Sequence, residues 1–209
     1  MTVLITGANR GIGAALARTY RKMGKNVIGT ARGGDDFWKL DVTREADFPA
    51  LEKRLQDTAL SLLICNAGIY ADKGLRDEQR DAQVWARSFA VNVTGVYLTV
   101  QACLPALRRG AGKIALLGSA MGSDQRAPGG SYAYRASKAA LLNLGRNFAA
   151  DLDLPVGIYH PGWVRTDMGG DGADIAVEDS VSGLIARFTE LDRGSSGCFM
   201  SYDGKPVPF

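Results

Sequence analysis

Two residues that could transfer a proton, Tyr134 and Lys138, stand four positions apart in the segment YRASK. Residues at this spacing share one face of a helix. An ammonium group beside a phenol favours the phenolate, so we expect the pKa of Tyr134 to lie below its ordinary value of about 10. Such a tyrosine can give a proton to a carbonyl oxygen or take one from an alcohol. The pair alone is a weak motif, because a surface helix can carry Tyr and Lys by chance.

The amino-terminal run TVLITGANRGIGAALARTY predicts a strand, a glycine-rich turn and a helix. Gly7 can take backbone conformations closed to other residues, while Gly11 and Gly13 allow a ligand and the strand to come close. The first N–H groups of the helix would face an anion, which the helix dipole also favours. The spacing is G-x-x-x-G-x-G, not the common G-x-G-x-x-G. We predict a diphosphate-binding turn, although the glycines alone also fit an ordinary turn.

Ser119 follows an apolar run at 113–118 that predicts a buried strand. Ligands of open parallel sheets bind beyond the carboxyl ends of the strands, so this serine could hydrogen-bond a substrate carbonyl. A serine in an ordinary turn is the alternative. Tyr134 comes fifteen residues later, which is enough chain for its helix to fold back over the strand end. The two side chains are therefore candidates for one site.

Together these motifs resemble the short-chain dehydrogenase/reductase family. The resemblance covers essentially the whole chain and includes the following stretches: TGANRGIG at 6–13, Asp41-Val42, Cys65-Asn66-Ala67-Gly68, Asn92, Ser119, Tyr134 with Lys138, and Pro161-Gly162 followed by Thr166. The family's usual N-N-A-G begins with Cys65 here, which is a mild departure. The runs HPGWVRTDMGG and YDGKPVPF narrow the resemblance to a short subgroup with C-factor-like and sniffer-like carbonyl reductases.

The resemblance implies reversible hydride transfer between a nicotinamide cofactor and a carbonyl or alcohol. Ser119 and Tyr134 would hydrogen-bond the carbonyl oxygen, and Tyr134 would deliver the proton. Lys138 would tune the phenol and bind the nicotinamide ribose, and Asn92 would hold a water that relays protons to Lys138. These four are the candidate catalytic residues.

The resemblance also implies a set of cofactor contacts along the chain. Asp41 and Val42 would bind the adenine, and Asn66, Ala67 and Gly68 of the CNAG turn would bind the adenosine ribose. The Val164 backbone would bind the carboxamide, and Thr166 would lie near the diphosphate. The full set of candidate cofactor-binding residues is Gly7, Asn9, Arg10, Gly11, Ile12, Gly13, Arg32, Asp41, Val42, Asn66, Ala67, Gly68, Tyr134, Lys138, Pro161, Gly162, Val164 and Thr166.

The end of the second predicted strand indicates which cofactor is preferred. Enzymes that use NAD commonly place an acid there for the ribose 2′-hydroxyl, whereas an arginine suits a 2′-phosphate. Here the strand NVIGT is followed by Ala31-Arg32, with no carboxylate before Asp35. Arg32 and Arg10 offer planar donor forks for a phosphate. We expect NADP(H) to be favoured over NAD(H), although two solvated arginines are the alternative.

The alternation of strands and helices predicts one α/β domain over residues 1–209, a Rossmann-type doubly wound parallel sheet flanked by helices. Predicted strands are 2–6, 26–30, 38–40, 61–65, 113–118, 155–160 and 197–200. Predicted helices are 11–23, 44–57, 77–109 with a break near Ser88, 131–151 and 177–190.

Two connections are short. Eight residues separate Arg32 from Asp41, too few for the roughly 10–12 residues of a parallel crossover, so the second crossover helix should be missing or reduced. Ten residues separate Thr166 from the helix near Val177, too few for the family's substrate lid. We predict an exposed, shallow substrate cleft lined by Met121, Tyr70, Trp163 and Met168. These residues fit ordinary core packing as well.

Composition excludes several other classes. A chain of 209 residues with a net charge of +3 can bury a core and lacks the basic runs of a nucleic-acid-binding protein. We count no apolar stretch near the roughly 20 residues that span a bilayer, and so expect no membrane partner. Cys65, Cys103 and Cys198 lack metal-ligand spacing and fit a reducing cytoplasm, so we expect no metal. His160 fits a structural role.

The resemblance implies a small-molecule substrate and a homodimer through the helices at 77–109 and 131–151. A nucleotide-binding signalling or regulatory protein without relevant turnover is the competing class. The combination of Ser119, Tyr134 and Lys138 favours the enzyme, because a binding module needs no tuned phenol.

Overall fold

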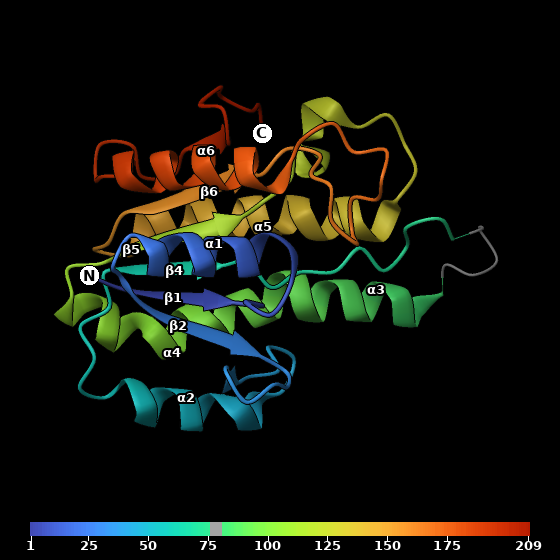
Figure 1. Cartoon of the computed structure of the whole chain (residues 1–209). Coiled ribbons are helices and arrows are strands. Elements are labelled where there is room, and N and C mark those ends of the chain that lie inside the picture. Colours follow the sequence, from blue (N-terminus) through green and yellow to red (C-terminus); the bar gives the residue numbers. More distant parts are fainter. Residues whose placement is uncertain (76–80) are drawn as a thin grey trace.

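The apolar runs predicted as strands lie side by side in one parallel sheet of the computed structural model, which describes residues 1–75 and 81–209. Within those residues the sheet has seven strands in the order β3-β2-β1-β4-β5-β6-β7 (Figure 1). Their bounds are β1 Thr2–Thr6, β2 Asn26–Ala31, β3 Trp38–Lys39, β4 Leu62–Cys65, β5 Lys113–Leu117, β6 Val156–His160 and β7 Phe199–Ser201. Every neighbouring pair is parallel. The predicted Rossmann-type doubly wound sheet is confirmed.

Helices cover both faces of the sheet (Figure 1). Those in the described residues are α1 Gly11–Lys22, α2 Phe48–Leu55, α3 Ala82–Phe89, α4 Gly95–Arg109, α5 Tyr132–Asp151 and α6 Val177–Glu190. α1 packs beside α6 on one face, while α2, α4 and α5 share a hydrophobic cluster on the other. Shorter 3-10 turns occupy Glu45–Asp47, Ala120–Gly122 and Asp124–Arg126.

Alternation along the central strands builds the two hydrophobic layers. In β1, Leu4 joins the cluster under α2, α4 and α5, whereas its neighbours Val3 and Ile5 join the cluster under α1 and α6. All three side chains are fully buried. A parallel sheet with helices on both faces requires this, because successive side chains point to opposite sides and neither side meets water.

Both predicted shortenings are confirmed. Residues 32–37, between β2 and β3, hold only bends and a turn, yet Trp38 still pairs in parallel with Thr30. Residues 165–176 carry no helix, and an isolated bridge between Val164 and Ile175 closes that loop. The crossover from β2 to β3 is thus a few residues of turn where an α/β protein usually places a helix, whereas residues 165–176 form a loop that leads into α6.

Two predicted helices differ from the structure in detail. The region 44–57 divides into the 3-10 turn Glu45–Asp47 and α2. In the region 77–109, residues 77–80 lie outside the described part, and α3 passes into α4 through a π-helical stretch at Ala90–Thr94. The predicted interruption near Ser88 is therefore a change of helical pitch. π-Helical turns are frequent at functional sites, and this one holds Asn92.

The stretch Ala82–Arg109 corrects one sequence expectation. Its 28 residues are helical throughout and apolar enough to cross a bilayer by length and composition, so the count of apolar stretches was wrong. However, 56% of its most apolar window is buried inside the protein. Val100, Cys103 and Leu107 of this stretch are fully buried in the cluster beneath the sheet. This burial indicates a helix of the protein core.

Candidate active site

A cleft of about 520 Å³ opens beyond the carboxyl ends of the central strands. Most of the residues predicted from the sequence line it: Gly7, Asn9, Arg10, Gly11, Ile12, Arg32, Asp41, Val42, Asn66, Ala67, Gly68, Tyr134, Lys138, Pro161, Thr166 and Met168. Gly13, Asn92, Ser119, Gly162 and Val164 are not among the lining residues and lie behind or beside them. The parallel topology explains the convergence, since these residues follow strand ends that meet at one edge.

The glycine turn is shaped by close approach. Gly7 and Gly11 have φ angles of +64° and +54°, in the left-handed region that favours glycine. A Cβ on Gly13 would lie 2.3 Å from the carbonyl oxygen of Gly7 and 2.4 Å from Nδ2 of Asn66, so only glycine fits there. Arg10 precedes α1 in extended backbone, and no side chain caps the helix. Its first N–H groups thus stand at the cleft, and the turn fits the diphosphate of a dinucleotide.

The side chain of Asn66 joins the ends of β1 and β4. Its Nδ2 donates to the carbonyl oxygens of Thr6 at 2.9 Å and Gly7 at 3.1 Å. In return, Oγ1 of Thr6 accepts from the backbone N–H groups of Asn66 and Ala67. Cys65, at the position that departs from the family motif, is buried in the core. The departure therefore leaves these bonds intact.

Tyr134, Ser119 and Lys138 come together as predicted, and all three are buried. The hydroxyl of Ser119 is close enough to the phenol of Tyr134 to oppose the rise in its pKa. Nζ of Lys138 lies 5.9 Å from the centroid of the Tyr134 ring and donates to the carbonyl oxygen of Leu117 at 2.8 Å. Helical spacing in α5 puts Tyr134 and Lys138 on one face, and the end of β5 brings Ser119 to it.

The predicted direction of the Tyr134 pKa is wrong for this arrangement. Burial raises the pKa of Tyr134 to about 12, with Tyr70 and Asp72 adding to the rise and the Ser119 hydrogen bond opposing it. Burial also lowers the pKa of Lys138 to about 8. The sequence argument counted the attraction between ammonium and phenolate. It did not include the loss of water around both groups, which penalises each charged form.

Asn92 is fully buried and its amide is engaged on every side. Oδ1 accepts from the N–H of Ile69 at 2.9 Å, and Nδ2 donates to the carbonyl oxygen of Ile69 at 2.9 Å and to Oγ of Ser137 at 3.0 Å. Oγ of Ser137 in turn donates to the carbonyl oxygen of Tyr134. Asn92 therefore ties the segment after β4 to α5. Its role in a water-mediated proton relay stays a prediction.

Comparison with known proteins agrees with this geometry. A family model described as short chain dehydrogenase matches residues 1–174, which is most of the chain. The protein belongs to the short-chain dehydrogenase family. It is thus an oxidoreductase of the class that acts on CH–OH or C=O groups with a nicotinamide cofactor.

Several proteins of known name are similar to this chain in sequence or structure. C-signal from Myxococcus xanthus is 40% identical over 158 residues, covering 72% of this chain and 93% of that protein. The crystal structure of an NADPH-bound carbonyl reductase from chicken fatty liver matches with a TM-score of 0.89 and 28% identity, over 100% of this chain and 98% of that one. Carbonyl reductase Sniffer of D. melanogaster matches with a TM-score of 0.89 and 28% identity, over 100% and 99%.

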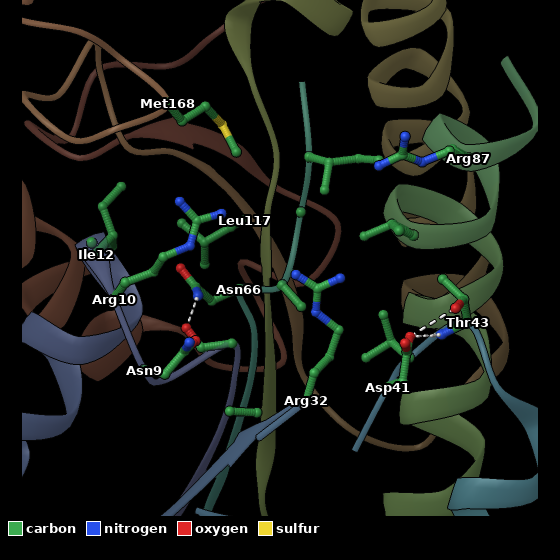
Figure 2. Close-up of a pocket in the computed structure, with 18 of the residues that line it drawn as sticks. Asn9, Arg10, Ile12, Arg32, Asp41, Thr43, Asn66, Arg87, Leu117 and Met168 are labelled. Atoms are coloured by element: carbon green, nitrogen blue, oxygen red, sulfur yellow. Dashed lines mark hydrogen bonds between the residues drawn. The ribbon is translucent and has the colours of Figure 1, made fainter. Parts of the chain in front are cut away.

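In this short-chain dehydrogenase, three arginines from separate elements reach the cleft (Figure 2). Arg10 pairs with Asp167 across the opening, Nη1 to Oδ2 at 3.0 Å, and both side chains are exposed. Arg32 lies close enough to Asp41 to help lower the pKa of that carboxyl, after the hydrogen bonds from Thr43. The cleft therefore presents positive charge where Arg10 and Arg32 line it.

Arg87, the third arginine, was missed by sequence reasoning. It lies on α3 and lines the cleft with Ala90 and Val91 (Figure 2). The sequence held only part of the signal. Arg87 stands four residues before Val91 and so shares its helix face, but which face of α3 meets the cleft follows from tertiary packing.

The four residues predicted to line the substrate cleft lie in different surroundings. Of the four, Met168 lines the cleft. Tyr70 stacks on Tyr134, with ring centroids 4.2 Å apart. Trp163 is 53% exposed, so it is not core, and its Nε1 donates to the carbonyl oxygen of Gly169. Met121 is half-buried beside Ser119, where its N–H donates to the serine Oγ.

The buried Lys138 leads to a prediction about stability. With a pKa near 8 in the folded protein and 10.5 when unfolded, its protonated form opposes folding. That penalty is complete below about pH 8 and disappears as the pH rises towards 10.5, and it amounts to about 3 kcal/mol. Lys138→Met should therefore unfold at higher denaturant concentration than the parent at pH 7, with the difference shrinking as pH increases.

Denaturant unfolding of nucleotide-free protein between pH 7 and 10 checks this prediction. The lost bond to the Leu117 carbonyl lowers the stability of the variant at every pH alike, so the pH dependence is the informative quantity. Lys22→Met, on the exposed end of α1, is the matched control and should parallel the parent. A constant difference between Lys138→Met and the parent would contradict the prediction.

Proposed function

We propose that this protein is an NADP(H)-dependent carbonyl reductase of broad specificity. The observation that carries the proposal is the buried group of Tyr134, Ser119 and Lys138 at the edge of a dinucleotide-sized cleft. Groups of this kind are expensive to bury, since each charged form loses its hydration. A protein that only bound a nucleotide could use the ammonium to hold a ribose, but it would gain nothing from a buried phenol beside that ammonium.

The raised pKa of Tyr134 suits reduction. A phenol with a pKa of about 12 stays protonated at neutral pH and has its proton ready for a carbonyl oxygen that gains negative charge. Ser119 donates a second hydrogen bond to that oxygen and thereby polarises the carbonyl. Bound NADPH supplies the hydride. After proton transfer, the Lys138 ammonium and the Ser119 hydroxyl stabilise the tyrosinate.

The preference for NADP(H) over NAD(H) rests on charge at the adenine end. Arg32 directly follows β2, where an acid would serve a ribose hydroxyl, and Arg10 lies in the glycine turn and lines the same cleft. Within the described residues, Arg32 forms no ion pair that a bound phosphate would have to break. Arg10 forms an ion pair with Asp167, and both side chains of that pair are exposed. Such exposed pairs contribute little, so a phosphate can displace the carboxylate. The NADPH-bound carbonyl reductase from chicken supports the same preference.

Replacing Tyr134 with Phe tests the catalytic assignment. The change keeps the ring and its stacking but removes the proton, so kcat for carbonyl reduction should fall by about 10²–10⁴-fold. Fluorescence titration should show NADPH binding changed little. Tyr20→Phe is the matched control, because Tyr20 is also buried, in α1 away from the cleft. Turnover by Tyr134→Phe within several-fold of the parent would contradict the assignment of Tyr134 as the proton donor.

Replacing Arg32 with Asp tests the cofactor preference. The change removes a hydrogen-bond donor to the 2′-phosphate and adds a carboxylate that can accept a hydrogen bond from the ribose 2′-hydroxyl. The Kd for NADPH should therefore rise by about 10- to 100-fold, while the Kd for NADH stays level or falls. Arg18→Asp makes the same charge change on the exposed side of α1 and should alter neither constant. Equal weakening of both nucleotides by Arg32→Asp would contradict the phosphate argument.

The likeness to C-signal keeps a second class open, a nucleotide-binding signalling or regulatory protein without relevant turnover. One experiment separates the classes. NADPH and NADH are titrated by fluorescence, and a panel of aldehydes and ketones is then screened for oxidation of the bound cofactor. Binding together with turnover of any carbonyl, abolished by Tyr134→Phe, supports the reductase. Tight binding without turnover across the panel supports the signalling class.

We also propose that the protein forms a homodimer in the cytoplasm. Exposed aromatic rings on the helical face support an interface: Trp85 of α3 stacks on Phe89, and Tyr97 of α4 stacks on Phe148 of α5. All three cysteines are free thiols, as a reducing compartment would keep them.

The dimer is tested by sedimentation at micromolar concentration. The parent should sediment as a dimer, and Tyr97→Asp should sediment as a monomer, because a charge buried at the interface is costly. Met23→Asp, at an equally exposed apolar position after α1, should stay dimeric. A monomeric parent would overturn the proposal.

A further inference from the structure

The first turn of α5, which carries Tyr134, is not capped by its own residues. Ser131 precedes the helix with a φ of +49° and makes no side-chain cap. The cap comes instead from Asp72, in the segment after β4. Oδ2 of Asp72 accepts from the N–H of Ala133 at 2.9 Å, and Oδ1 accepts from the N–H of Tyr134 itself at 3.2 Å. A residue 62 positions away thus fixes the backbone of the phenol.

The same segment holds the side chain of Tyr134. The ring of Tyr70 stacks on the ring of Tyr134 at 4.2 Å between centroids and 19° between planes. The hydroxyl of Tyr70 shares a hydrogen bond with Oγ of Ser131, at the start of the helix. Tyr70 therefore covers one face of the phenol, and a substrate carbonyl must approach from another side.

A comparison within the chain shows that Asp72 differs from an ordinary cap. Asp81 caps α3 with two similar bonds, to the N–H groups of Gln83 and Val84, but Asp81 is exposed. Asp72 is 1% exposed. A buried carboxylate loses its hydration, whereas a buried serine or asparagine can cap a helix without charge. Capping alone therefore does not account for an acid at this position.

The groups around the phenol show what the charge does. Lys138 faces the Tyr134 ring from the same helix, and Ser119 approaches the phenol from the end of β5. Tyr70 and Asp72 face it from the segment after β4. The negative charge of Asp72 disfavours the tyrosinate and adds to the raised pKa of Tyr134. Asp72 thus helps to keep the proton on the phenol, against the pull of Lys138.

We propose that Asp72 is a positioning residue for the reduction, which orients Tyr134 through its backbone and, together with the stacked Tyr70, keeps its hydroxyl aimed at the substrate carbonyl. This inference rests on the proposed reductase function. Asp72 touches neither substrate nor cofactor in this scheme and acts through Tyr134.

Two substitutions at Asp72 separate its cap from its charge. Asp72→Ala removes both, so kcat should fall by about 10- to 100-fold with KM nearly unchanged, because the proton donor is displaced. Asp72→Asn keeps an acceptor for one N–H and should recover most of kcat. It removes the charge, so the loss of reduction rate at high pH should move to lower pH by about 0.5–1 unit. Asp81→Ala and Asp81→Asn are the matched controls and should leave the pH profile in place.

Contradictory outcomes are well defined. An unchanged pH profile in a folded Asp72→Asn variant would overturn the inference, as would an unchanged kcat in Asp72→Ala. If Asp72→Ala fails to fold, the pH profile of Asp72→Asn still tests the inference. Failure of the parent to reduce any carbonyl would count against the proposed function alone. Amide exchange then tests the positioning: Ala133 and Tyr134 should exchange faster in Asp72→Asn than in the parent but not in Asp81→Asn, and equal exchange would reject it.

Discussion

The hydrogen bonds between the ends of β1 and β4 are the interaction on which the site depends. Asn66 gives its amide protons to two carbonyl groups at the end of β1, and Thr6 accepts two N–H groups in return. These bonds extend the strand pairing beyond the ladder, at the point where the chain turns into α1. The close approach of Gly13 to Gly7 and Asn66 is possible only because all three are held there. The glycine turn and the CNAG turn are therefore one structure, not two independent motifs.

Burial then sets the chemistry that this edge can support. Water is excluded from Tyr134 and Lys138, so each resists its charged form, and the pKa of Tyr134 rises while that of Lys138 falls. The two shifts move the pKa values of the two groups apart, from 10.0 and 10.5 to about 12 for Tyr134 and about 8 for Lys138, so that the uncharged form of each is favoured. The buried ammonium of Lys138 lowers the stability of the folded protein but places a cation next to the phenol, and such losses of stability are common at functional sites.

Most of the fold and much of the site were predictable from the sequence, for local reasons. Apolar runs bounded by turns marked the strands, and the short connections after Arg32 and Thr166 predicted missing helices. Tyr134 and Ser119 come together because α5 folds back over the carboxyl end of β5. What failed depends on distant contacts: the pKa direction follows from burial, and the acid that caps α5 lies in a loop with no capping signal. Arg87 was missed because the phase of α3 relative to the cleft follows from tertiary packing.

The missing lid helix does not leave the substrate loop without support. Nζ of Lys73 donates to the carbonyl oxygens of Met168 at 2.6 Å and Gly169 at 3.2 Å, and Trp163 donates to the same Gly169 oxygen. Asp72 and Lys73 are adjacent, so one short segment holds the start of α5 on one side and the substrate loop on the other. The two attachments differ in strength. The carboxylate contacts are buried, whereas the ammonium contacts are exposed and contribute little to stability because water screens them. The phenol is thus held by buried contacts and the loop opposite it by exposed ones, a division that suits the broad specificity proposed for this protein.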